Sequence, residues 1–100
     1  MNIKGLDLQQ QQELGEIAKE NDIEFIGLFG SYARGEQNEQ SDIDLLVKFD
    51  FSSKRIGLFG LHKIQTQMEQ LLNNKVDIIS RPNKFINPYI QKDLITIYER

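Results

Sequence analysis

Two short motifs combine the residue types that handle nucleotide phosphates and metal ions. Gly30-Ser31 is followed by ten residues and then by Asp42-Ile43-Asp44. Backbone N–H groups at a strand-to-helix turn can hold phosphate oxygens, and the Ser31 hydroxyl adds a further donor. Paired carboxylates supply the oxygen ligands that Mg²⁺ prefers. The spacing therefore predicts a nucleotide and metal site.

Two predicted strands position these motifs. Residues 23–29 form an apolar run rich in β-branched and aromatic side chains that ends at the Gly-Ser turn, which indicates a buried strand. Residues 42–49 predict a second strand, in which Asp42 and Asp44 share one face because side chains alternate. Two unpaired carboxylates beside a buried strand are costly, so a cation that bridges them to substrate phosphates makes physical sense.

A third acid lies in another apolar run. Asp77 is part of Val76-Asp77-Ile78-Ile79, which predicts a short strand. If this strand lies beside the strand at residues 42–49, three carboxylates converge. Such a set can hold two metal ions roughly 3.5–4 Å apart.

The remaining elements predict an α/β (α+β) fold, a small mixed β-sheet covered by helices. Helical spacing after Asp7 predicts a first helix at residues 8–20, and an apolar stripe predicts another at residues 56–72. Asn87 before a proline predicts the N-cap of a last helix. The apolar stripe expected on that helix consists of Ile90, Leu94, Ile97 and Tyr98.

Composition limits the possible functions. One hundred residues suffice for a single small domain, here residues 1–100, with an open rather than a closed site. A net charge of −3 gives no footprint for DNA or RNA, so we expect no direct nucleic-acid binding. The absence of cysteine, of a long apolar run and of a signal-peptide pattern predicts a cytoplasmic protein without membrane contact.

Three segments carry a family resemblance. Residues 30–36 (GSYARGE), 41–47 (SDIDLLV) and 76–79 (VDII) resemble the minimal nucleotidyltransferases (MNT) of the DNA polymerase β superfamily, and in particular the antitoxin half of HEPN/MNT modules. The resemblance covers nearly the whole chain. It implies the nucleotidyltransferase fold and a single minimal nucleotidyltransferase domain.

The resemblance also implies roles for individual residues. Gly30 and Ser31 match the nucleotide-phosphate turn, and Asp42 and Asp44 match the paired Mg²⁺ ligands. Asp77 matches the third acid, which completes the metal site and helps deprotonate the attacking hydroxyl. The implied reaction uses ATP and two Mg²⁺ ions. It transfers AMP to a tyrosine of a HEPN-type ribonuclease toxin and releases pyrophosphate.

Several residues have two interpretations. Arg34 either approaches the nucleotide phosphates or neutralises the dipole at the end of a short helix, and the two are equally favoured. His62, the one histidine of the sequence, is better explained as a partly exposed helical residue than as a general base. Three phenylalanines are expected in the core, and any exposed member would mark a partner surface: Phe49, Phe51 and Phe59.

Two other functions remain open from the sequence. One is a binding-only antitoxin that neutralises its partner by forming a complex. The other is nucleotide transfer to a small molecule such as an antibiotic, which the short chain disfavours because such enzymes resemble this core joined to a further substrate-binding domain.

Overall fold

A four-stranded mixed sheet organises the fold. The computed structural model describes residues 2–50 and 57–100. Within these residues the elements in chain order are α1 (Leu8–Glu20), β1 (Ile23–Phe29), α2 (Ser31–Arg34), β2 (Ile43–Phe49), α3 (Leu58–Leu72), β3 (Val76–Ile79), α4 (Asn87–Asp93) and β4 (Ile95–Glu99).

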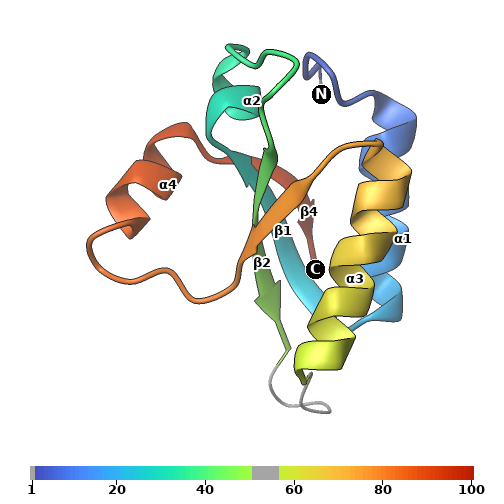
Figure 1. Cartoon of the computed structure of the whole chain (residues 1–100). Helices are drawn as coiled ribbons and strands as arrows, with labels where there is room; N and C mark the ends of the chain where they lie inside the picture. Colours follow the sequence, from blue (N-terminus) through green and yellow to red (C-terminus); the bar gives the residue numbers. More distant parts are fainter. Residues whose placement is uncertain (1, 51–56) are drawn as a thin grey trace.

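The strand order is β3-β2-β1-β4. Strand β1 pairs antiparallel with β2 and with β4, whereas β2 and β3 are parallel. Helices α1 and α3 pack side by side on one face of the sheet, and α4 lies on the opposite side (Figure 1). This arrangement confirms the predicted α/β (α+β) fold with a small mixed sheet covered by helices.

The core lies between the sheet and the pair α1 and α3. Ile43, Leu45 and Val47 of β2 are buried in this core together with residues of both helices. Because side chains alternate along a strand, Asp44 and Leu46 face the other side of the sheet. On that side of the sheet, Leu46 of β2 and Ile90 of α4 are buried, outside the main core cluster. The acidic face is thus the one that α1 and α3 leave uncovered.

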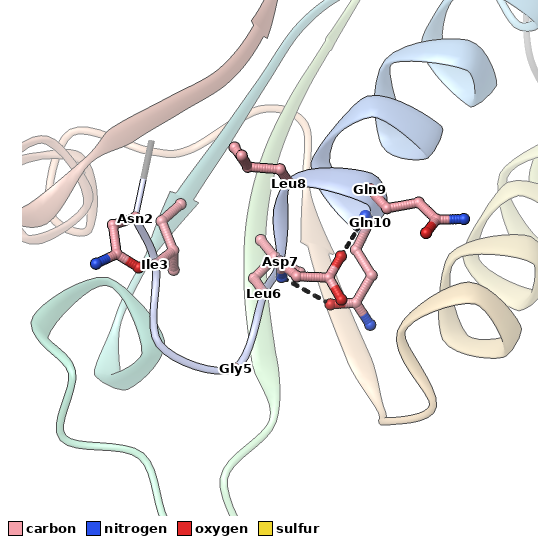
Figure 2. Close-up of a pocket in the computed structure, with 8 residues that line it drawn as sticks. All are labelled: Asn2, Ile3, Gly5, Leu6, Asp7, Leu8, Gln9 and Gln10. Atoms are coloured by element: carbon pink, nitrogen blue, oxygen red, sulfur yellow. Dashed lines mark hydrogen bonds between the residues drawn. The ribbon is translucent and has the colours of Figure 1, made fainter.

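The first two predicted long helices are confirmed. Asp7 caps α1 through a capping box in which it exchanges hydrogen bonds of 2.8 and 2.9 Å with Gln10 (Figure 2). Helix α3 ends at Leu72, and its C-cap residue Asn73 adopts the left-handed conformation. The predicted start of that helix at Ile56, and Phe51, lie outside the described residues. No helix in the described part of the chain is long and apolar enough to cross a bilayer.

The prediction for the C-terminus was wrong in part. Helix α4 ends at Asp93, and Leu94 is extended. The apolar residues that follow form β4, since the β-branched run Ile95-Thr96-Ile97 fills the free edge of β1 and gains ladder hydrogen bonds there. The N-cap position is Ile86 rather than Asn87. The side-chain oxygen before the helix comes from Asn83, which accepts from the backbone N–H groups of residues 85 and 86 at 2.9 Å.

Candidate active site

The Gly-Ser turn connects β1 to α2, as predicted. Gly30 has φ +76° and ψ −154°, a conformation that residues with a Cβ rarely adopt. Helix α2 is a single turn, in which the Arg34 N–H donates to the Gly30 carbonyl at 3.2 Å. It closes at Gly35, which has φ +69°. Ser31 is half-buried at the start of this turn.

Asp44 lies at the centre of a row of residues that crosses three strands. It pairs with Phe29 on β1 and with Asp77 on the parallel strand β3. Burial raises the pKa of Asp44 most, and the negative charges of Asp77 and Asp42 raise it further, while Arg34 opposes these effects. Asp44 therefore carries its charge in an unfavourable, negatively charged surrounding.

The Gly-Ser turn and the Asp44 carboxylate are in direct contact. Gly30 follows Phe29, the register partner of Asp44, so the strand pairing brings them together. A Cβ on Gly30 would overlap Oδ2 of Asp44 and lie 3.2 Å from its Cγ. Only glycine leaves room for both the turn and the carboxylate. The structure thus brings a phosphate-type turn and an acid side by side.

The other two acids flank Asp44 differently. Asp42 is half-buried and directly precedes β2, whereas Asp77 is exposed on β3. The predicted adjacency of their strands is confirmed. No group of three or more histidine, cysteine, aspartate or glutamate side chains in the described residues is arranged to hold a metal ion as it stands. The oxygen donors nevertheless fit Mg²⁺, which commonly keeps several waters and takes one or two carboxylates together with substrate phosphates.

Arg34 is held by two acids that the sequence did not link to it. Its Nη1 donates to Oδ2 of Asp93 on α4 at 2.9 Å, and its Nε donates to Oε1 of Glu36 at 3.2 Å. The hydrogen bond to Asp93 raises the pKa of Arg34 most. Arg34 also occupies the last turn of α2. Its contact with nucleotide stays a prediction.

The other candidate residues are placed as follows. His62 is exposed on α3. Tyr32 packs against the core, and its hydroxyl accepts a hydrogen bond from Asn74 at 2.8 Å. Phe49 is buried, but Phe59 is 93% exposed. By the criterion set from the sequence, Phe59 marks a candidate partner surface.

A hollow in the surface has none of the three candidate acids Asp42, Asp44 and Asp77 in its lining. It is lined by Asn2, Ile3, Gly5, Leu6, Asp7, Leu8, Gln9 and Gln10 (Figure 2). These side chains come from the N-terminal segment and the start of α1, and none of them was predicted to carry chemistry. The acidic face of the sheet, with its clustered charges, is the better candidate site because charge and the phosphate-type turn coincide there.

Sequence reasoning missed two residues next to the site. Asp93 reaches Arg34 across 59 positions of the chain, and no local pattern marks that pair. Asn74 was not singled out from the sequence. The pair Asn73-Asn74 directly after the apolar stripe could have indicated a turn, because asparagine tolerates the left-handed conformation and its side chain bonds nearby backbone groups.

Comparison with known proteins identifies the family of this chain. The family model for polymerase beta nucleotidyltransferases matches residues 12–100. The chain belongs to the polymerase beta nucleotidyltransferase family. A Methanocaldococcus jannaschii relative of this nucleotidyltransferase, named "Putative protein adenylyltransferase", is 38% identical over 92% of the chain and 87% of the relative.

Solved structures share the fold of this nucleotidyltransferase. One, described as "Structure of putative minimal nucleotidyltransferase", is 27% identical with a TM-score of 0.76 and covers 95% of both chains. Another belongs to a complex of a tri-AMPylated Shewanella oneidensis HEPN toxin with an MNT antitoxin. It is 14% identical with a TM-score of 0.67, and it covers 92% of this nucleotidyltransferase and 71% of the matched chain. At that identity the likeness concerns the fold alone.

Proposed function

We propose that this nucleotidyltransferase transfers AMP from ATP to a tyrosine of a HEPN-type ribonuclease toxin and acts as the antitoxin of that partner. The words protein adenylyltransferase in the name of the Methanocaldococcus jannaschii relative support AMP transfer to a protein. The solved complex of an MNT antitoxin with an AMPylated HEPN toxin supports the partner class. We further propose that residues 1–100 act as one minimal domain in the cytoplasm.

The contact between Gly30 and the Asp44 carboxylate carries this proposal. It sets backbone donors for phosphate beside an acid whose register partner is Asp77. Adenylyl transfer needs this combination, because the triphosphate must be bound with its α-phosphorus next to the metal-binding carboxylates. A structural turn would gain nothing from a charged, half-buried side chain pressed against it.

The proposed mechanism assigns a task to each site residue. Asp42, Asp44 and Asp77 would hold two Mg²⁺ ions, which when bound offset phosphate charge and lower the cost of ionising the acceptor hydroxyl. The Gly30 turn and the Ser31 hydroxyl donate hydrogen bonds to the β- and γ-phosphate oxygens. Arg34 adds positive charge near these phosphates.

The bond changes follow from this placement. Asp77 helps take the proton from the acceptor hydroxyl, whose oxygen forms a bond to the α-phosphorus of ATP. The bond between that phosphorus and the bridging oxygen breaks in line, and pyrophosphate leaves. A tyrosine hydroxyl has an ordinary pKa of about 10, so help with deprotonation is chemically useful. Asp77 is exposed, which leaves it accessible to an acceptor on a docked protein.

The test compares the wild type with Asp42→Asn and Asp44→Asn. Each is incubated with Mg²⁺, ATP labelled at the α-phosphate, and a candidate HEPN-type partner protein. Intact-mass spectrometry of the partner should show one or more added adenylyl groups with wild type and none with either variant. Glu39→Gln is the matched control, because it removes an exposed acid from the loop between α2 and β2.

Three results would contradict parts of the proposal. Normal labelling by Asp42→Asn or Asp44→Asn would refute their role as metal ligands. If the partner stays unmodified and the double variant Asp42→Asn/Asp44→Asn still inhibits it fully, the protein is a binding-only antitoxin. Label that appears on small molecules alone would identify an enzyme of the antibiotic-modifying kind.

A further inference from the structure

The side chain of Asn74 makes three hydrogen bonds at the junction between α3 and β3. Its Nδ2 donates to the hydroxyl of Tyr32 at 2.8 Å and to the carbonyl of Ser41 at 3.1 Å. Its Oδ1 accepts from the backbone N–H of Lys75 at 2.7 Å. One side chain thus links α2 and the segment before β2 to the residue that precedes β3.

Two of these contacts adjoin a residue of the proposed site. Tyr32 directly follows Ser31 in α2, and Ser41 directly precedes Asp42. The backbone N–H of Ile43 donates to the carbonyl of Lys75 at 2.9 Å. Asp42 therefore lies between two hydrogen-bonded backbone groups. The carbonyl of Ser41 accepts from Asn74, and the N–H of Ile43 donates to Lys75.

We propose that Asn74 is a positioning residue that sets the phosphate turn in register with the carboxylates. The inference rests on the proposed function, because that proposal divides the site into a nucleotide half, the Gly30-Ser31 turn, and a metal half, the carboxylates. Asn74 is assigned the role of aligning these two halves. Asn74 touches neither half directly. It acts through Tyr32 on one side and through the Ser41 backbone on the other.

The fold itself depends on other contacts at this junction. Ile64, Met68 and Val76 are buried in the core and hold α3 against the sheet. Gln65 Nε2 donates to the carbonyl of Val76 at 2.8 Å, and the Val76 N–H donates to Oε2 of Glu69 at 3.0 Å. These bonds link α3 to β3 but do not reach α2 or Asp42. Gln65 therefore offers a matched control from the same junction.

The experiment measures, with no acceptor protein present, how far Mg²⁺ tightens the binding of AMP-PNP, an ATP analogue with nitrogen in place of the oxygen between the β- and γ-phosphates. Calorimetric titrations with Mg²⁺ and with EDTA give the ratio of the two dissociation constants. This ratio reports whether phosphates and carboxylates can share the ions. A loss of stability alone would leave the ratio unchanged, because both titrations start from the same folded protein.

We expect Asn74→Ala to lower this ratio by roughly ten-fold or more, since small misplacements of groups that act together are costly. Tyr32→Phe removes one acceptor oxygen and should lower the ratio less. Gln65→Ala should keep the wild-type ratio, with a thermal unfolding curve that shows a comparable loss of stability. If Asn74→Ala does not fold, Tyr32→Phe alone decides the outcome.

Two results separate this inference from the proposed function. A wild-type ratio in both Asn74→Ala and Tyr32→Phe would overturn the positioning role while leaving the proposed function intact. Wild-type protein that binds AMP-PNP equally well with and without Mg²⁺ would overturn the proposed function itself.

Discussion

Gly30→Ala tests the contact on which the proposed site depends. The backbone at Gly30, with φ +76° and ψ −154°, costs other residues about 1–3 kcal/mol. The added Cβ would also overlap the Asp44 carboxylate. Moving that carboxylate off its preferred rotamer costs about 0.5–1.5 kcal/mol. We therefore expect Gly30→Ala to lower the free energy of unfolding by roughly 1.5–4.5 kcal/mol.

Gly35→Ala provides the matched control for backbone strain. Gly35 also has positive φ, +69°, but in the described part of the chain a Cβ there would meet no atom within 4 Å. Its substitution should cost about 1–2 kcal/mol, the usual cost of the left-handed conformation. Urea unfolding of both variants at pH 7 gives the two values, and their difference combines the overlap with Asp44 and the different backbone conformations of the two glycines.

A double-mutant cycle with Asp44→Ala isolates the overlap directly. The Cβ of Asp44 would lie 3.5 Å from the new Cβ at Gly30, an ordinary contact. Gly30→Ala should therefore cost less in the Asp44→Ala background than in the wild type. Equal costs in the two backgrounds, or equal costs for Gly30→Ala and Gly35→Ala, would refute the reasoning.

Three further predictions concern the same site. Because the pKa of Asp44 is raised in the folded chain, the unfolded chain releases that proton at lower pH, and the folded state loses stability as pH rises through this range. Asp44→Asn should therefore be more stable than the wild type at neutral pH, with the difference vanishing below the ordinary pKa of aspartate; urea unfolding across pH checks this. Ser31→Ala should raise the KM for ATP less than Gly30→Ala does, since the backbone donors remain, and steady-state kinetics with varied ATP measure both. Asp93→Asn should change unfolding free energy by less than about 1 kcal/mol, because its partner Arg34 is 42% exposed, and urea unfolding tests this value.

Much of the fold was predictable because its signals are local. The capping box at Asp7 lies within four residues, and the apolar stripes of α1 and α3 repeat at helical spacing. Alternation along β2 correctly placed Asp44 opposite the core residues Ile43 and Leu45. Each of these patterns can be interpreted without knowing what the segment packs against.

The C-terminus shows where local patterns are insufficient. Ile90, Leu94 and Ile97 have helical spacing, yet the chain leaves the helix after Asp93. Strand β4 forms because the edge of β1 is free to pair with it. A spacing that fits a helix over a few positions cannot compete with a row of hydrogen bonds from a neighbouring strand, and the sequence does not reveal that neighbour.

The sequence by itself indicated the chemistry proposed for the site, namely a Gly-Ser turn, the strand acids Asp44 and Asp77, and Asp42 directly before β2. Only the tertiary structure decided how close these groups lie: Gly30 against the Asp44 carboxylate, Asp77 in register with Asp44, and Asn74 between α2 and β2. The physical reason is that residue type and alternation are properties of one segment. Contacts depend on strand register and on side chains from distant segments, which no single segment encodes.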